Sequence, residues 1–353
     1  MNMRLIVTLI AMSTVFLLSS IDLQAHVSPI SEENFKSIGD TPNTVLIKSR
    51  LENLSGAIDV RYDREVRTRV LEYTVFGRAN TEEMLGRAVK YFPLVEEKLR
   101  EKNLPTELKY IAVVESMLRP TAKSHMGAFG IWQFMPSTGR MYGLEKNALV
   151  DQRADPVLAT DAALNYLSDL YEQFGDWTVA MAAYNGGPGN VRKAIRRSGK
   201  TDFWGMKAYL PKETQKYVPR IIAAAYLMNY YHTHNLSPKG IDAHFQETDV
   251  VVPLETLSLV EISNNLNLDL TNLKALNPIY KTDQILANGK NPLRLPKNRL
   301  QMFYLHYNQG SIEDLMAISD GVRQFRETNS LDSLDKIHRI MQAYNDSSPI
   351  SDV

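Results

Sequence analysis

The chain has 353 residues, of which 44% are hydrophobic, and its 40 basic and 40 acidic residues give a formal net charge of zero. This length and composition suit one large and one small packed domain, and they exclude a largely disordered chain. The balanced charge gives no overall field that would attract nucleic acid, and the absence of cysteine excludes disulfides, thiol catalysis and cysteine metal sites.

Residues 1–25 have the pattern of a secretory signal peptide. A short positive start at residues 1–4 precedes an apolar run over 5–18 and a cleavage-site pattern at 23–25. An uncleaved membrane anchor is the alternative, although the run is short for a spanning helix. We therefore expect export to the periplasm without stable membrane insertion after cleavage. A lipoprotein is excluded because no cysteine is present to carry the lipid.

Helical patterning begins after a polar stretch. Residues 26–44 contain Gly39 and Pro42 and are typical of a flexible lead-in, and residues 45–240 follow as the expected main domain. Within it, Asn80-Thr81-Glu82-Glu83 has the spacing of a capping box and predicts a helix start at Asn80. No strand pattern of any length occurs before His232, so this region should be nearly all α.

One glutamate lies on the apolar face of a predicted helix. Leu108, Ile111 and Glu115 share that face, Pro105 suits the first turn, and Pro120 stops the helix soon after Glu115. Burial and the negative end of the helix dipole should both raise the pKa of Glu115. A carboxyl with a raised pKa can hold a proton near neutral pH and give it to a leaving oxygen, as cleavage of a glycosidic bond requires.

A glycine-containing loop follows this helix. Gly127 and Gly130 allow sharp backbone turns and a close approach to a ligand, which would place Trp132 and Gln133 beside the acid. The alternative interpretation of the glutamate is a structural acid paired with Arg119, one helical turn further on.

Further helices are predicted over 161–174 and 177–184, the second ending at Gly186-Gly187, so that Tyr184 lies at a helix end. Two histidines, His232 and His234, have no acid or third histidine near them in the sequence, and we predict no metal site. No phosphate-binding glycine loop occurs, so no cofactor is implied.

The pattern changes at Thr248. Strand, two helices and strand over residues 248–308 resemble a LysM domain, a small glycan-binding module, and Leu276-Asn277-Pro278 resembles its asparagine turn. The usual Gly-Asp before the first helix is absent, and residues 281–291 look like an insertion. Glycan binding and mere packing both remain open for this module. A tail over 309–353 should hold one amphipathic helix, with Leu334 and Ile337 on its apolar face, and a disordered end.

Several short blocks occur in a fixed order between about Val45 and Tyr231. They are Leu104-Pro105-Thr106-Glu107-Leu108, Val114-Glu115-Ser116, Gly127-Ala128-Phe129-Gly130-Ile131-Trp132-Gln133-Phe134-Met135-Pro136, Ala183-Tyr184-Asn185-Gly186-Gly187 and Glu213-Thr214-Gln215-Lys216-Tyr217-Val218. In this order they resemble the lytic transglycosylases of bacterial cell-wall metabolism, most closely the membrane-bound lytic transglycosylase D type, within the wider lysozyme-like group.

The resemblance implies a mainly α fold, with a lysozyme-like all-helical catalytic domain followed by a small α+β LysM-like module. It implies that Glu115 is the catalytic acid and then the base. The candidate substrate-binding residues are Ser124, Trp132, Gln133, Met135, Tyr184, Asn185 and Tyr217, and Trp132 is included because sugar faces stack on aromatic rings. Two departures from the family are Gln152, where many relatives have an acid, and Phe129 in place of a small residue.

The implied reaction is cleavage of the bond between N-acetylmuramic acid and N-acetylglucosamine in peptidoglycan strands, with a 1,6-anhydromuramyl product. Two alternatives stay open: a hydrolytic lysozyme of the goose type, and a non-catalytic wall-binding protein. Ordinary glycosidases need a second carboxylate, and the acids that could supply one here are Asp151, Asp155, Asp161 and Asp176.

Overall fold

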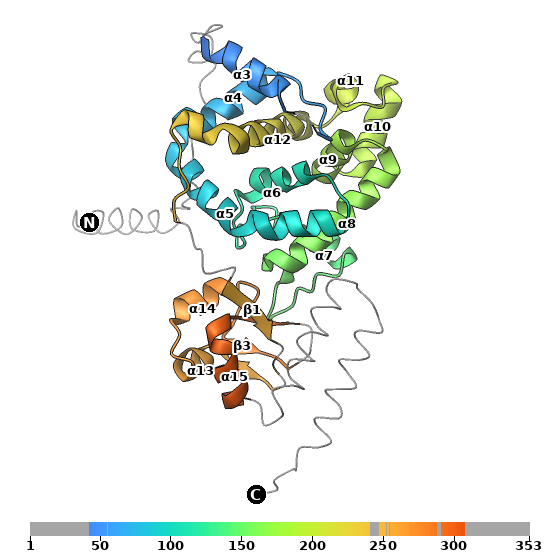
Figure 1. The fold of residues 1–353 in the computed structure, drawn as a ribbon. Helices are drawn as coiled ribbons and strands as arrows, with labels where there is room; N and C mark the ends of the chain where they lie inside the picture. Colours follow the sequence, from blue (N-terminus) through green and yellow to red (C-terminus); the bar gives the residue numbers. More distant parts are fainter. Residues whose placement is uncertain are drawn as a thin grey trace, which may run out of the picture. The chain divides into compact units, whose positions relative to one another are not determined.

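The computed structural model describes residues 42–54, 56–240, 247–251, 253, 255–287 and 291–307. Its first part is helical (Figure 1), with α3 (Pro42–Glu52), α4 (Arg64–Leu71), α5 (Arg78–Glu101), α6 (Lys109–Ser116), α7 (Pro136–Met141), α8 (Pro156–Phe174), α9 (Trp177–Gly186), α10 (Pro188–Ser198), α11 (Phe203–Met206) and α12 (Lys212–Tyr230). A π-helical turn covers Glu72–Phe76, and short 3-10 turns include Thr106–Leu108 and Gln152–Ala154. The prediction of a mainly helical chain with a small strand-containing C-terminal region is confirmed.

Local capping sets the helices around the site. The side chain of Asp155 accepts hydrogen bonds from the Val157 and Leu158 amides at the start of α8, and Pro156 occupies the first helical position. Gly175, with φ of 69°, ends α8 in the left-handed conformation that glycine adopts most easily. The side chain of Asp176 then caps α9. Each aspartate satisfies amides that a helix start leaves without partners.

Helix α5 begins earlier than the capping-box pattern predicts. It starts at Arg78, so Asn80 lies inside its first turn, and the predicted start is wrong. The reason is the π-helical turn before it, which ends where the Gly77 amide bonds the Glu72 carbonyl. The Gly77 carbonyl already accepts from the Thr81 amide, so the helical bonding begins at that glycine rather than at Asn80.

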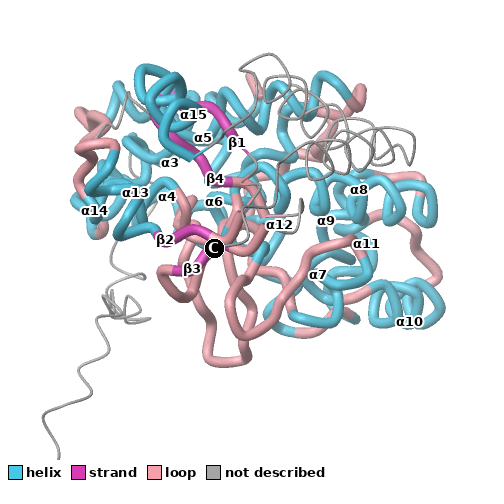
Figure 2. Tube along the Cα trace, turned by 90° about the horizontal axis from the view of Figure 1, so that it is seen from below, coloured by secondary structure: helices cyan, strands magenta, loops and turns pink. Residues whose placement is uncertain are grey.

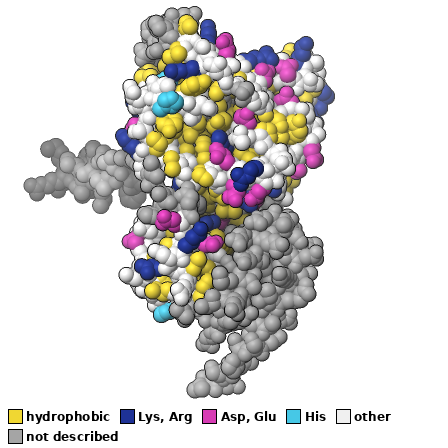
Figure 3. Space-filling model, viewed as in Figure 1, with side chains coloured by type: hydrophobic (Ala, Val, Ile, Leu, Met, Phe, Trp, Pro, Cys, Tyr) yellow, Lys and Arg dark blue, Asp and Glu magenta, His cyan; other side chains and the backbone are white. Residues whose placement is uncertain are grey.

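The core of the helical part is built around α6 and α12. Helix α12 packs on α4, α6 and α9, while α8 packs on α5 and α9. Ile111, Ala112 and Val113 of α6 have no exposed surface, nor do Ile221 and Ile222 of α12. Helix α6 is thus a central element of the core, whereas basic and acidic side chains are mixed over the surface shown in Figure 3.

The C-terminal module contains the strands of the described chain (Figure 2). Its elements are β1 (Thr248–Val251), β2 (Leu257–Ser258), α13 (Leu259–Asn265), α14 (Leu270–Leu276), β3 (Gln284–Ile285), β4 (Leu293–Pro296) and α15 (Leu300–Tyr307). Strands β1 and β4 pair antiparallel, with Thr248 opposite Pro296, and β2 pairs antiparallel with β3. A core of its own includes Ile262, Leu295 and Phe303.

Asn277 joins the second helix of the module to the last strand. Its side-chain amide donates to the carbonyls of Leu273 and Arg294, both at 2.9 Å, and its oxygen accepts from the Arg294 amide at 2.7 Å. This residue is 4% exposed, and both its side-chain nitrogen and its side-chain oxygen form hydrogen bonds inside the protein. It forms the asparagine turn that the sequence predicts.

Some expectations fall outside the described residues. The signal-peptide pattern at 1–25 and the predicted tail helix with Leu334 and Ile337 lie there. Among the residues that are described, none of the helices combines the length and apolarity that a membrane span needs.

The central place of α6 leads to a stability prediction. Ile111→Ala removes three carbon atoms from a fully buried position and should lower the free energy of unfolding by about 3 kcal/mol, because a cavity remains. Denaturant unfolding followed by tryptophan fluorescence measures it. Met141→Ala, at a side chain 79% exposed, serves as the control and should change stability little. Equal effects of the two variants would contradict the central role of α6.

Candidate active site

Glu115 is the next-to-last residue of α6, as the sequence predicts. The helix ends at Ser116, and the following Met117 and Leu118 both have left-handed backbones, with φ of 52° and 60°. This end is closed by bonds from the Met117 amide to the Val113 carbonyl and from Arg87 Nε to the Met117 carbonyl, at 2.9 and 2.8 Å. Two adjacent non-glycine residues in this conformation are rare and cost free energy. The chain direction immediately after Glu115 is therefore tightly fixed.

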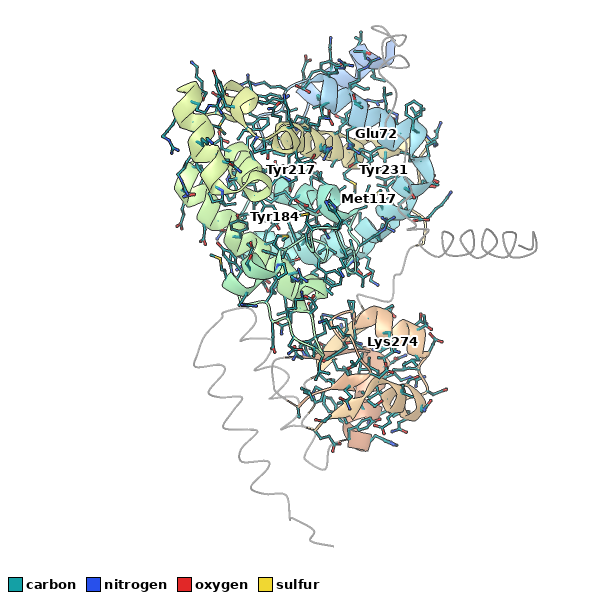
Figure 4. The ribbon with its side chains drawn as sticks, turned by 180° about the vertical axis from the view of Figure 1, so that it is seen from behind. Glu72, Met117, Tyr184, Tyr217, Tyr231 and Lys274 are labelled. Carbon is teal, nitrogen blue, oxygen red and sulfur yellow. The ribbon has the colours of Figure 1, made fainter. Side chains whose placement is uncertain are left out.

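The carboxyl group of Glu115 has a direct partner on α12. The Tyr217 hydroxyl donates a hydrogen bond of 2.5 Å to Glu115 Oε1, and the Tyr217 side chain is 2% exposed. Figure 4 labels Tyr217 on α12, Tyr184 on α9 and Met117 at the end of α6. Arg119, the partner considered from the sequence, is exposed, and the charges that act on Glu115 are those of Glu213 and Arg220.

Burial raises the pKa of Glu115, so this residue keeps its proton at higher pH than an ordinary glutamate does. It raises the pKa from the usual 4.5 to about 7, while the Tyr217 hydrogen bond acts in the opposite direction because it favours the charged carboxylate. The charge of Glu213 adds to the increase and that of Arg220 reduces it. Glu115 still keeps part of its surface accessible. Near neutral pH it can both give and take a proton, as a general acid and base must.

The loop over residues 122–134, called here the substrate loop, is tied to α6. Ser116 Oγ donates to the Ile131 carbonyl at 2.9 Å, directly after the candidate acid. Within the loop, the Gly130 amide bonds the Ala122 carbonyl, and Phe129 and Phe134 exchange both backbone bonds. An added Cβ at Gly130 would lie 1.8 Å from the Arg153 carbonyl oxygen, so only glycine fits there.

Gln133 lies in the substrate loop with a left-handed backbone, at φ of 50°. Its side-chain nitrogen donates to the carbonyls of Ala122 and Gly130, at 3.0 and 2.8 Å. These two bonds fix the amide and orient its oxygen as an acceptor. Strain of this kind at a candidate ligand contact is typical of functional loops.

Trp132 is placed differently from our expectation. Its ring has no exposed surface, and Nε1 donates to Thr160 Oγ1 at 2.9 Å, so the prediction of a sugar-stacking ring is wrong. The main chain of this residue matters instead, since its carbonyl accepts a 2.8 Å bond from the Tyr184 hydroxyl. Tyr184 is partly exposed at the end of α9, and burial and the charge of Glu115 raise its pKa well above the usual value. Tyr184 therefore lies close to the acid.

The other candidate residues occupy the surroundings of the site. Ser124 Oγ accepts from the Ala128 amide at 3.0 Å and shapes the substrate loop, and Met135 is 39% exposed just before α7. Asn185 Oδ1 accepts from Thr214 Oγ1 at 2.9 Å, which ties α9 to α12. Gly186 makes this approach possible, because an added Cβ there would lie 2.6 Å from the same hydroxyl.

The four aspartates considered as a second carboxylate have other partners. Asp151 forms a buried ion pair with Arg153 at 2.7 Å, and Asp161 Oδ2 lies 3.8 Å from Lys98 Nζ. Asp155 and Asp176 cap α8 and α9. These contacts commit all four to structural roles.

The histidine pair lies away from the acid. His234 Nε2 is 2.9 Å from the Tyr226 hydroxyl at the end of α12. Within the described ranges, no group of three or more His, Cys, Asp or Glu side chains could hold a metal ion.

Two residues with a clear role near the site were missed by the sequence reasoning. Ser116 holds the substrate loop, and its position next to the acid in the Val-Glu-Ser block could have suggested this. Arg153 donates from one guanidinium nitrogen to the carbonyls of Gly127 and Phe134, at 2.9 and 2.8 Å. Nothing in the sequence pattern distinguishes this arginine from one on the surface.

Two ranges of the sequence match known protein-family models. Residues 93–207 match the model described as the transglycosylase SLT domain, and residues 247–312 match the model described as the LysM-like domain of lytic transglycosylase MltD. Two parts of the chain thus match these two domain models in this order. Glu115, the substrate loop and Tyr184 fall inside the first match, whereas Tyr217 lies beyond it.

The chain is also similar to individual proteins that are named as lytic murein transglycosylases. The chain is 35% identical over 219 residues to membrane-bound lytic murein transglycosylase D of Escherichia coli K12, over 60% of this chain and 47% of that protein. It is 34% identical over 128 residues to the soluble lytic murein transglycosylase of the same organism, over 34% of this chain and 20% of that protein. The chain thus spans about half the length of the first of these relatives.

Among solved structures, the lytic transglycosylase Slt of Pseudomonas aeruginosa, an inactive mutant, is 25% identical with a TM-score of 0.36, over 52% of this chain and 30% of that one. The 70 kDa soluble lytic transglycosylase of Escherichia coli is 26% identical with a TM-score of 0.37, over 52% of this chain and 30% of that one.

The contact between Glu115 and Tyr217 can be tested without an activity assay. Tyr217→Phe removes a hydrogen bond that favours the carboxylate, so the pKa of Glu115 should rise further above about 7. Titration of protein with ¹³C-labelled glutamate, followed by NMR at the side-chain carboxyl carbons, measures this. Tyr184→Phe is the matched control, because that hydroxyl donates to the Trp132 carbonyl instead. A pKa that falls or stays unchanged in Tyr217→Phe would contradict the assigned interaction.

Proposed function

We propose that this chain, with its SLT domain and LysM-like domain, is an exported peptidoglycan lytic transglycosylase. It cleaves the β-1,4 bond between N-acetylmuramic acid and N-acetylglucosamine without adding water and leaves a 1,6-anhydromuramyl end. The observation that carries the proposal is one partly buried carboxyl, Glu115, whose pKa of about 7 suits proton transfer in both directions.

In the first step, Glu115 is protonated and donates its proton to the glycosidic oxygen. The bond between that oxygen and the anomeric carbon of the muramyl sugar breaks, and the glucosaminyl chain leaves with a 4-hydroxyl. Burial supports this step because it raises the pKa and keeps the proton on Glu115 near neutral pH.

In the second step, the Glu115 carboxylate takes the proton of the muramyl 6-hydroxyl, and that oxygen bonds to the anomeric carbon. The enzyme returns to its protonated form, and no water is consumed. The Tyr217 hydroxyl supports this step because it donates a hydrogen bond to the carboxylate that exists between the two proton transfers.

A single-carboxylate mechanism is favoured over hydrolysis by the contacts of the four aspartates considered as a second carboxylate. Hydrolases of the ordinary kind use a second carboxylate to activate water or attack the sugar. Asp151, Asp155, Asp161 and Asp176 are each engaged with a cation or a helix start. A hydrolytic lysozyme on this fold would need a base or nucleophile from elsewhere.

Substrate contacts are proposed from the accessible polar and flexible groups near the acid. The oxygen of Gln133, whose nitrogen is held by two carbonyls, suits a hydroxyl or acetamido N–H group. Met135 offers exposed apolar surface at the start of α7. Ser124 and Asn185 shape the loop and helix end on which these groups lie, and Tyr184 presents a partly exposed ring.

The location follows from the N-terminal pattern and the substrate. A signal peptide at residues 1–25 would deliver the chain to the periplasm, where peptidoglycan strands are its partner. We propose a periplasmic protein that is associated with the cell wall.

Glu115→Gln should abolish release of anhydromuropeptides from purified peptidoglycan while the fold is kept, because it removes the transferable proton and preserves the shape. Mass spectrometry of the released products measures this, and wild-type products should be one water lighter than hydrolytic ones. The control is Glu172→Gln, the same chemical change on the exposed face of α8, which should leave release unchanged.

The remaining outcomes separate the alternatives. Reducing ends in the wild-type products would indicate a hydrolytic lysozyme. Binding to peptidoglycan without products from either form would indicate a non-catalytic wall-binding protein.

A further inference from the structure

The LysM-like domain contacts a loop of the SLT domain through backbone pairing. The Asp151 amide donates to the Ile279 carbonyl at 2.9 Å, and the Lys281 amide donates to the Leu149 carbonyl at 2.8 Å. Val150 and Tyr280 form an antiparallel bridge between these bonds. We call residues 149–152 the docking strip. Two-way backbone bonding of this kind fixes register as well as contact.

A buried pair of amide side chains continues the contact. Gln152 Nε2 donates to Asn291 Oδ1 at 2.9 Å, and these residues are only 5% and 2% exposed. Gln152 Oε1 also accepts from the Glu145 amide at 2.8 Å, so both ends of this side chain are bonded. Leu276 of the LysM-like domain adds apolar contact with the core of the SLT domain. Separation of the two domains would break this hydrogen bond between two buried amides, which costs free energy.

The docking strip continues directly into the support of the substrate loop. Asp151 binds Arg153 through two guanidinium nitrogens, at 2.8 and 2.7 Å. Arg153, which is 4% exposed, donates hydrogen bonds to the carbonyls of Gly127 and Phe134 in the substrate loop. Its own carbonyl lies against Gly130. One short segment thus bonds the LysM-like domain through residues 149–152 and the substrate loop through Arg153.

We propose that the LysM-like domain is a positioning element of the catalytic site: by docking on residues 149–152 it sets the conformation of the substrate loop that carries Gln133. Two of the residues that supply this contact, Lys281 and Asn291, lie at the ends of the insertion in the sequence. The contacts to the strip itself are between backbone groups and uncharged amides. Glu115 is held separately, by α6 and Tyr217.

Hydrogen exchange of the full chain tests the coupling. Asn291→Ala removes the acceptor of Gln152 and should speed exchange of the bonded Phe129, Gly130 and Phe134 amides about tenfold, because the strip is loosened. Lys274→Ala, which breaks an exposed ion pair with Asp283 in the same domain, is the control and should leave that exchange unchanged.

Gln152→Ala approaches the same bond from the SLT domain and should give the same result, and the double variant should add little to either change. Gln152→Ala still tests the proposed coupling if Asn291→Ala unfolds the LysM-like domain. Unchanged exchange of the substrate loop in Gln152→Ala, or an equal change in Lys274→Ala, would overturn the proposal.

The activity readout rests on the proposed function, whereas the exchange readout does not. With short soluble glycan strands, Asn291→Ala and Gln152→Ala should raise KM about tenfold and leave kcat close to wild type, because the loop binds substrate and Glu115 is unaffected. A fall in kcat at unchanged KM would contradict positioning of a binding loop. Absence of cleavage by the wild type would overturn the proposed function and leave the exchange result standing.

Discussion

The site depends on one balance: a carboxyl group must be buried enough to keep its proton and accessible enough to pass it on. Glu115 meets both demands because α6 lies in the core and ends one residue later. Burial raises its pKa, and the Tyr217 hydroxyl limits the rise by bonding the charged form. Burial favours the neutral carboxyl group, and the hydrogen bond from Tyr217 favours the charged carboxylate.

The remaining contacts serve to keep that balance in place. Ser116 ties the substrate loop to α6, the Tyr184 hydroxyl holds the Trp132 carbonyl, and Asn185 links α9 to α12. Backbone carbonyls, rather than side chains, receive most of these bonds. A loop that is fixed through its backbone can present Gln133 to a ligand while the neighbouring Trp132 side chain lies in the core.

The sequence predicted what local pattern controls. The spacing of apolar residues and the positions of glycine and proline predicted the Glu115 helix and its end near the acid. They also predicted the turns of the substrate loop and the change of pattern at Thr248. The bond to Tyr217 was not, because its partner lies 102 residues further on and long-range pairing leaves no local signal. The predictions for the start of α5 and for the Trp132 ring were wrong, because a π-helical turn directly precedes α5 and a buried threonine accepts a hydrogen bond from the Trp132 ring. The docking strip depends on an insertion whose length is visible in the sequence, although its contacts are not.

The left-handed pair Met117 and Leu118 has a consequence for protein engineering. Conformations of this kind cost about 1 kcal/mol each for ordinary side chains, and glycine would relieve that cost at position 117. The same change would give the backbone after Glu115 more conformational freedom, so the position of the Glu115 carboxyl group would be less fixed. A search for thermostable variants would therefore select at this helix end for mutations that raise heat resistance and make the position of Glu115 less fixed.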